Sequence, residues 1–343
     1  MVINMTVEMN LGKDSYSIEV ERGVLASVGE QIDLNRRVLI VTDEGVPKEY
    51  AVKVADQCKK AVICTLEQGE SSKSLEKLAF LLQTMLDSGF SRKDLVIAVG
   101  GGVIGDLAGF AASVYMRGID FCNIPTTLLS QIDSSIGGKT AINFGGVKNT
   151  VGAFYQPKKV LIDPLLLKTL PKRQISNGLA EAIKMALTSD AELFGLLEKG
   201  DIEENIDEVI MRSLNVKRSV VEKDEKETGL RRILNFGHTV GHGIESTNEG
   251  TLYHGECVAL GMIPMCDEKI REKVIGVLKK YGLYRIMEYD WEKIASAAFH
   301  DKKADGDTVT VIAVSSVGSF EIKKMQCSQV IENAKNVLEG LKQ

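Results

Sequence analysis

Three of the four histidines in this chain fall within one short stretch. His238 and His242 stand four residues apart, and His254 follows after a short connection. Residues four apart share one face of a helix, and His254 opens the next predicted helix, so three imidazoles can converge. The alternative is that the three rings simply pack in a core. Because imidazole is a common metal ligand, we favour a metal site.

A carboxylate from a neighbouring helix could complete such a site. The pattern Ala180-Glu-Ala-Ile-Lys184 places Glu181 and Lys184 on one helix face. A solvated ion pair would give the same pattern. A mixture of histidine and carboxylate ligands favours zinc, and an open coordination position would make the site catalytic.

A glycine-rich turn, Gly100-Gly-Gly-Val-Ile-Gly105, follows a predicted strand and opens a predicted helix. Glycines at such a turn let the backbone N–H groups of the helix approach a pyrophosphate. Tight packing of a strand against a helix would use the same glycines. Asp43, Glu70 and Lys73 follow two other predicted strands and are expected along the same edge, which favours a dinucleotide.

Four cations lie in glycine-rich or apolar surroundings, where a positive charge often meets an anionic ligand. They are Arg117, Lys139, Lys148 and Lys184. The segment Gly137-Gly-Lys-Thr140 is similar to the tail of a phosphate-binding loop, but its leading glycine is not at Walker spacing. We therefore reject ATP hydrolysis by this motif.

The elements that must position these residues change character near residue 172. Before it, β-rich runs alternate with helical patterns, which predicts a Rossmann-like α/β domain (1–172) with a parallel sheet and helices on both faces. After it, a mainly α-helical domain (173–343) is expected. The predicted strands are 16–20, 37–42, 61–65, 94–99 and 159–163, with helices at 46–60 and 74–88. Later helices are predicted at 172–187, 191–200, 202–222, 235–246 and 255–273, then a hairpin (308–314, 318–323) and a helix from Ser328.

Composition narrows the function classes. The 42 Lys+Arg against 47 Asp+Glu give a net charge of −5, so no broad basic field is available for nucleic acid. Six scattered cysteines without a CxxC pair indicate reduced thiols in a cytoplasmic protein, and no export signal is visible. Residues 95–116 are largely apolar, but three consecutive glycines and Asp106 argue against a membrane span.

Five segments, 100–110, 125–140, 177–184, 234–242 and 254–257, occur in an order that resembles the 3-dehydroquinate synthase family of the sugar phosphate cyclase superfamily. The resemblance covers nearly the whole chain. It implies a homodimeric lyase of the shikimate pathway, in aromatic amino acid biosynthesis, that uses NAD and zinc or cobalt. The implied reaction converts 3-deoxy-D-arabino-heptulosonate 7-phosphate to 3-dehydroquinate and phosphate, through transient oxidation by NAD, phosphate elimination, re-reduction and intramolecular aldol closure.

The resemblance also implies residue roles. Glu181, His238 and His254 match the metal ligands, and Glu227 and His242 match acid–base positions. Positions around the substrate are matched by Arg117, Asp133, Lys139, Asn149, Lys184, Lys217, Arg231, Asn235 and His242, with either Lys302 or Lys303. NAD-contacting positions are matched by Asp43, Glu70, Lys73, Gly101, Gly102, Val103, Asp106, Thr126, Thr127, Lys139, Lys148, Leu167, Lys168, Thr169 and Asn177. The segment Thr42-Asp-Glu-Gly45 departs from the family pattern, so no role is carried over to Glu44.

Three other readings stay open from the sequence. A related cyclase could act on another sugar phosphate, although Arg231, Asn149 and Lys139 favour the heptulosonate. A metal-dependent polyol dehydrogenase of the glycerol dehydrogenase type would have less need of so many cations and would release NADH with its product. A catalytically silent relative is disfavoured by the intact Lys139, Glu181 and histidines.

Overall fold

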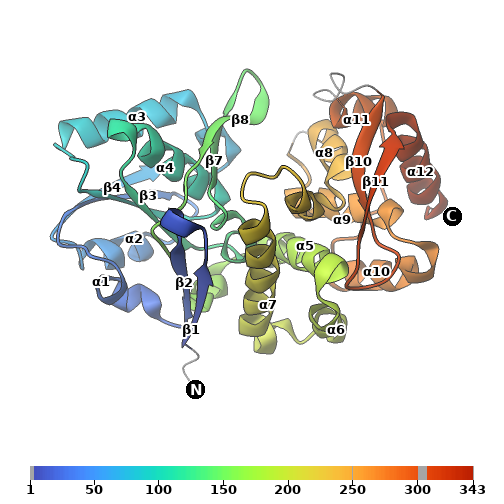
Figure 1. Ribbon diagram of the computed structural model, residues 1–343, viewed down its shortest axis with the longest axis horizontal. Helices are drawn as coiled ribbons and strands as arrows, with labels where there is room; N and C mark the ends of the chain where they lie inside the picture. The colour runs from blue at the N-terminus through green and yellow to red at the C-terminus, as the bar shows by residue number, and fades with distance from the viewer. Residues whose placement is uncertain (1–3, 249, 300–306, 343) are drawn as a thin grey trace. The chain divides into compact units, whose positions relative to one another are not determined.

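The computed structural model describes residues 4–248, 250–299 and 307–342. The chain divides into two compact units, Met1–Pro171 (unit 1) and Lys172–Gln343 (unit 2), and most of their helices and strands are labelled in Figure 1. Unit 1 is an α/β unit built on one large sheet. Unit 2 is mainly helical, so the predicted fold class is confirmed.

The sheet of unit 1 has seven strands in the order β1-β2-β9-β6-β5-β3-β4. All five predicted strands are confirmed. All neighbouring pairs from β2 to β4 are parallel, but β1 is antiparallel to β2, so the sheet is mixed and not wholly parallel as predicted. The strands are β1 (Asn4–Met9), β2 (Tyr16–Glu21), β3 (Arg37–Asp43), β4 (Lys60–Leu66), β5 (Leu95–Gly100), β6 (Asp120–Pro125) and β9 (Lys159–Ile162).

Helices cover both faces of this sheet, as the alternating pattern predicts. On one face Leu81, Met85 and Leu107 of the helices pack against odd-numbered β3 residues such as Leu39. On the other face helical residues including Val54 pack against the even-numbered ones. The first group comprises α3 (Leu75–Asp87) and α4 (Gly102–Val114), and the second η2 (Val24–Ser27), α1 (Val28–Gln31) and α2 (Lys48–Ala55).

This arrangement creates a topological switch point between β3 and β5. The two strands are neighbours, yet β3 leads into α2 on one face and β5 leads into α4 on the other. Open α/β sheets bind ligands at such points, outside the carboxyl ends of the strands. The carboxyl ends of β3, β4, β5 and β6 share this edge, because Asp43 pairs with Leu66 and Gly100 with Pro125.

A separate hairpin packs against α4 and consists of β7 (Lys139–Phe144) and β8 (Val147–Phe154). Short turns connect the larger elements of unit 1. They are η1 (Gly12–Asp14), η3 (Glu70–Ser72), η4 (Tyr115–Arg117), the π-helical turn η5 (Ser130–Ser134) and η6 (Pro164–Thr169).

Unit 2 begins with α5 (Lys172–Ser189), α6 (Ala191–Lys199) and α7 (Ile202–Lys223), close to their predicted bounds. The predicted hairpin is confirmed as β10 (Thr308–Ala313) and β11 (Glu321–Gln326), followed by α12 (Cys327–Gly340). The remaining elements are η7 (Leu230–Asn235), α8 (His238–Thr247), α9 (His254–Met262), η8 (Ile263–Met265), α10 (Glu268–Lys280) and α11 (Trp291–Ala298). Among the described residues, no helix is both long and apolar enough to cross a bilayer.

Two helix predictions in unit 2 need correction. The single helix expected at 255–273 is two helices, because Pro264 lacks the N–H that a continuing helix needs and Cys266 is extended. The helix expected from residue 235 begins at His238, because Gly237 adopts a left-handed conformation (φ 77°) between η7 and α8.

The helices α8 and α9 cross at very short range because glycines line the crossing. A Cβ atom at Gly261 would lie 2.0 Å from the carbonyl oxygen of Gly237, and one at Gly241 would lie 2.9 Å from that of Cys257. No larger residue fits between these backbones. The crossing therefore brings the histidines of α8 close to the first turn of α9.

Candidate functional site

The histidine cluster (His238, His242 and His254) is assembled at this crossing. His238 and His242 lie one turn apart on α8, and His254 is the first residue of α9. One ring nitrogen of each lies within 4.8 Å of the others, and the ring centroids are 5.0 to 5.7 Å apart. The three imidazoles thus converge as their spacing predicts.

Glu181 of α5 reaches the same cluster and is completely buried. Its Oε1 lies 3.5 Å from Nε2 of His254 and 3.8 Å from Nε2 of His238. Ligands of a tetrahedral zinc ion, each at about 2.0–2.2 Å from the metal, lie about 3.4 Å from one another. The observed separations fit that geometry.

Both rings next to Glu181 are oriented by their other nitrogen. Nδ1 of His254 is 3.0 Å from Oε2 of Glu245, and Nδ1 of His238 is 3.2 Å from the carbonyl oxygen of Phe236. Histidines that bind metals usually donate their free N–H to a carboxylate or a carbonyl in this way. The donor set therefore fits a divalent metal, with Nε2 of each ring available to it.

Opposing charges set the protonation of the cluster. Burial disfavours the Glu181 carboxylate, but its ion pair with Lys184 and the nearby histidines lower its pKa well below the usual range. Burial and Lys184 lower the pKa of His238 well below its ordinary value. Burial acts in the same direction on His254, but hydrogen bonds to Glu181 and Glu245 raise its pKa to about 9. A metal would therefore displace a proton from His254.

The loop after α7 and the following turn η7 carry Glu227, matched to an acid–base position, and Arg231 and Asn235, matched to the substrate. Nδ2 of Asn235 donates to Oε1 of Glu227 at 2.6 Å. Arg231, which lies between these two residues in the sequence, is almost fully buried. Glu227 adopts a left-handed conformation (φ 60°). The loop is held by the carboxylate of Asp224, which accepts the N–H groups of Thr228 (2.8 Å), Gly229 (2.7 Å) and Arg231 (2.9 Å).

The bonds to Asp224 predict an acid-sensitive loop. The N–H of Arg231, with those of Thr228 and Gly229, lowers the pKa of Asp224 to about 2. A carboxylate with a depressed folded pKa stabilises fully above its ordinary pKa, near 4, and loses this effect as the pH falls through the folded value. Asp224→Asn should therefore lower the denaturation midpoint at pH 6, and the difference from the parent should shrink between about pH 4 and pH 2. A difference that is constant over this range would contradict the assignment.

The carboxyl edge of the unit 1 sheet carries most of the residues matched to NAD. Asp43 ends β3, Glu70 and Lys73 follow β4, and the turn from Gly101 through Gly102 and Val103 to Asp106 opens α4. Thr126 and Thr127 follow β6. These residues are brought to one edge by the parallel register, as predicted.

Lys73 joins this edge to the β7–β8 hairpin. Its buried ammonium lies 2.6 Å from Oδ2 of Asp106 and also donates to Oδ1 of Asn149, which has a left-handed backbone (φ 56°). Asn143 adds a second connection, donating to Glu70 at 2.9 Å and accepting the N–H of Asn149 at 2.9 Å. The hairpin, which also bears Lys139 and Lys148, is thus anchored beside the glycine turn.

Other predicted residues are placed elsewhere. Arg117 follows the far end of α4 and precedes β6, so it lies toward the amino edge of the sheet, away from the glycine turn. Asp133 lies in η5, and Lys217 is buried in α7. Leu167, Lys168 and Thr169 lie in η6, where Oγ1 of Thr169 is 3.0 Å from the hydroxyl of Tyr50. Lys302 and Lys303 lie outside the described residues.

Sequence reasoning missed two carboxylates near the histidine cluster. Glu245 stands seven residues after His238 on α8, and this spacing on the same helix face was the signal that could have revealed it. Glu256, in the first turn of α9, is almost fully buried between two arginines. Its arginine partners are distant in sequence, so no local pattern identifies it.

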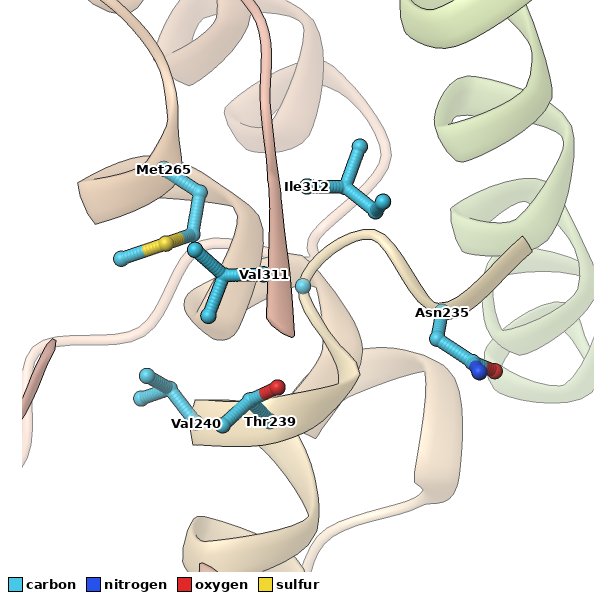
Figure 2. A pocket seen from close by; sticks show the side chains of 7 residues that line it. Asn235, Thr239, Val240, Met265, Val311 and Ile312 are labelled. Carbon is cyan, nitrogen blue, oxygen red and sulfur yellow. The ribbon is translucent and has the colours of Figure 1, made fainter. Parts of the chain in front are cut away.

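A small pocket lies beside the start of α8 and is lined by both apolar and polar residues. Figure 2 shows Met265 and Val311 on one side of it and Asn235 on the other. Its volume of about 10 Å³ is far below the 300–1,000 Å³ that is usual for small-molecule sites. This pocket alone therefore does not account for a sugar phosphate site. The full lining is Asn235, Gly237, Thr239, Val240, Met265, Val311 and Ile312.

Together these features define a class of protein: a Rossmann-like sheet with a nucleotide-type edge, in one chain with a helical unit that bears three converging histidines and a buried carboxylate beside two of them. Comparison with known proteins identifies the family within this class. The models for the 3-dehydroquinate synthase N-terminal and C-terminal regions match residues 63–177 and 178–304. A 3-dehydroquinate synthase from Latilactobacillus sakei subsp. sakei is 39% identical, covering 94% of this chain and 96% of that protein. The chain belongs to the 3-dehydroquinate synthase family, within the sugar phosphate cyclase superfamily.

Solved structures of related cyclases have the same fold. A 2-deoxy-scyllo-inosose synthase complexed with carbaglucose-6-phosphate, NAD+ and Co2+ matches with a TM-score of 0.88 and 27% identity, covering 97% of this chain and 100% of that one. A 2-epi-5-epi-valiolone synthase from Streptomyces hygroscopicus with NAD+ and Zn2+ bound matches at 0.85 and 28%, covering 95% and 97%. A probable glycerol dehydrogenase from Sinorhizobium meliloti, at 0.62 and 15% (94% and 96% covered), shares the fold alone.

Proposed function

We propose that this enzyme converts 3-deoxy-D-arabino-heptulosonate 7-phosphate to 3-dehydroquinate and phosphate, as a carbon–oxygen lyase of the shikimate pathway. Family membership over nearly the whole chain supports the reaction. The single observation that carries the mechanism is the buried Glu181 carboxylate, which lies between Nε2 of His238 and Nε2 of His254.

Residues 1–172 are assigned to NAD binding and residues 173–343 to metal and substrate binding. Glu181, His238 and His254 would hold zinc or cobalt, and the carboxyl edge of the sheet, with η6 and Asn177, would hold NAD. When bound, NAD supplies a reversible hydride acceptor, and the metal polarises substrate oxygens and lowers the pKa of hydroxyls. The family's bound relatives, which carry NAD+ with Co2+ or Zn2+, support both assignments.

The chain's own residues position an anionic substrate and manage its protons. Lys139, Lys184, Lys217 and Arg231 would bind its carboxylate and phosphate, which restricts a flexible sugar acid to reactive geometry. Asp133, Asn149 and Asn235 would supply further contacts, whereas Arg117, toward the amino edge of the sheet, stays unassigned. Glu227, oriented by Asn235, and His242 would hold and release protons.

Two broader assignments complete the proposal. The protein would act as a homodimer without nucleic acid or membrane partners, consistent with its net charge of −5. All six cysteines are free and four of them are buried, which supports a reducing, cytoplasmic compartment.

The experiment follows two products at once. Purified protein, NAD, zinc and the heptulosonate phosphate are mixed, and phosphate and NADH absorbance are recorded together. Because the hydride returns to the substrate in each turnover, phosphate should accumulate over many turnovers while NADH stays below one equivalent per site. NADH formed in proportion to product would select a polyol dehydrogenase. Turnover of another sugar phosphate, such as glucose 6-phosphate, in place of the heptulosonate would select a related cyclase, the class that includes the matched 2-deoxy-scyllo-inosose synthase.

A further inference from the structure

Helices α5 and α9 meet through three matched pairs of residues. Arg173, Asn177 and Glu181 stand four residues apart on α5 and therefore lie along one face of that helix. Their partners are three consecutive residues at the start of α9, taken in reverse order: Glu256, Gly255 and His254. The metal-ligand pair, Glu181 with His254, is thus the last step of a longer series of contacts.

The first pair joins a buried carboxylate to a partly exposed arginine with full hydrogen bonding. Glu256 is 1% exposed, and its Oε1 accepts from Nε of Arg173 and Nη2 of Arg285, each at 2.9 Å. Its Oε2 accepts from Nη2 of Arg173 at 2.8 Å and from the backbone N–H of Tyr253 at 2.8 Å. The guanidinium of Arg173 also lies 4.1 Å from the centre of the Tyr253 ring. A bidentate arginine fixes direction as well as distance, so the backbone next to His254 is tied to α5.

The second pair shows how closely the helices approach. The N–H of Gly255 donates to Oδ1 of Asn177 at 2.6 Å. A Cβ atom at Gly255 would lie only 2.2 Å from the backbone oxygen of Asn177, so no side chain fits there. The first turn of α9 therefore rests directly on α5, with His254 bracketed between Tyr253 and Gly255.

We propose that Glu256 is a positioning residue for the metal centre. Held by Arg173 and Arg285, it fixes the first turn of α9 so that Nε2 of His254 faces Glu181. The inference rests on the proposed metal site and adds a determinant of its affinity. A purely structural role would predict loss of stability alone, because Glu256 also accepts an N–H at the start of α9.

The test measures metal binding without turnover. Metal-free parent and variants are titrated with Co2+, and the Kd and the visible absorption of the bound ion are recorded. Glu256→Gln keeps the shape but loses the charge, and partners that orient metal ligands typically contribute about 10–100-fold in affinity. We expect a rise in Kd within that range and an altered absorption band. Arg173→Lys keeps the charge but loses the two-pronged contact, so a smaller shift in the same direction is expected.

The matched control is Glu19→Gln in unit 1. Glu19 is also a buried carboxylate, with Lys159 at 3.2 Å and Thr6 at 2.5 Å, and it lies in the sheet of the other unit. The Glu19→Gln variant should have a lower melting temperature than the parent and an unchanged Kd for Co2+.

The outcomes separate the inference from the proposed function. If the parent binds Co2+ and both Glu256→Gln and Arg173→Lys bind it as tightly, the positioning role is overturned while the metal site stands. If the parent itself binds no Co2+, the metal site and the inference fall together. If Glu256→Gln does not fold, the Kd of Arg173→Lys for Co2+ decides whether the positioning role holds. This variant is expected to fold, because Arg173 is partly exposed and the substitution keeps its positive charge.

Discussion

Glu181→Ala is expected to remove the bound metal and to reduce turnover by at least about 10³-fold. The change deletes the buried carboxylate whose Oε1 lies 3.5 Å from Nε2 of His254 and 3.8 Å from Nε2 of His238. Lewis-acid stabilisation by a metal contributes several kcal/mol to a transition state, and about 4 kcal/mol corresponds to this loss in rate. Metal content of the purified protein and phosphate release would be measured together.

The control for this variant is Glu198→Ala in the same unit. Glu198 is half exposed and pairs with Lys273 at 3.1 Å, so its removal should change neither metal content nor rate. A Glu181→Ala protein that keeps one metal per chain would show that His242 serves as the third ligand. Even without Glu181, one ring nitrogen of each of the three histidines lies within 4.8 Å of the others, which is close enough for all three to bind one metal ion.

Lys184→Met is expected to destabilise the metal-free protein by about 3–5 kcal/mol, because breaking a buried ion pair leaves one charge without compensation. Lys184 and Glu181 are both almost completely buried and pair directly. A divalent metal would supply the missing positive charge. The loss should therefore be largely reversed by zinc, as measured by denaturant unfolding with and without the ion.

Lys273→Met tests the same chemistry at the surface. Its partner Glu198 is exposed, so the free energy of unfolding should change by at most about 1 kcal/mol, with or without zinc. If Lys184→Met were equally mild without metal, the buried pair would not be a source of charge compensation. Turnover by Lys184→Met should stay low even with zinc, because we also place this lysine at the substrate.

The sequence predicted those parts of the fold and site that depend on local patterns. The strand at 94–99 was visible because β5 is buried along its whole length, which gives a continuous apolar run. His238 and His242 were visible because a helix places residues four apart on one face. Glu181 could be connected with them only as a possibility, because nothing local fixes which helix packs against α8.

The elements that were missed depend on long-range contacts or on weak patterns. Strand β6 carries Asp120, Asn123 and Pro125, which are unusual in strands, and it forms because parallel neighbours flank it on both sides. The bidentate contact between Arg173 and Glu256 joins residues 83 positions apart. Such pairings are set by packing and cannot be read from either segment alone.

Lys73 connects two residues that are proposed to bind different ligands. A single ammonium group contacts Asp106, proposed for NAD, and Asn149, proposed for the substrate. Two ligands that act on one shared group are thermodynamically linked, and such linkage is reciprocal. If bound nucleotide changes the affinity for the sugar acid through Lys73 by some factor, bound sugar acid must change the affinity for the nucleotide by the same factor. With both proposed roles, one side chain of unit 1 would couple the binding of cofactor and substrate.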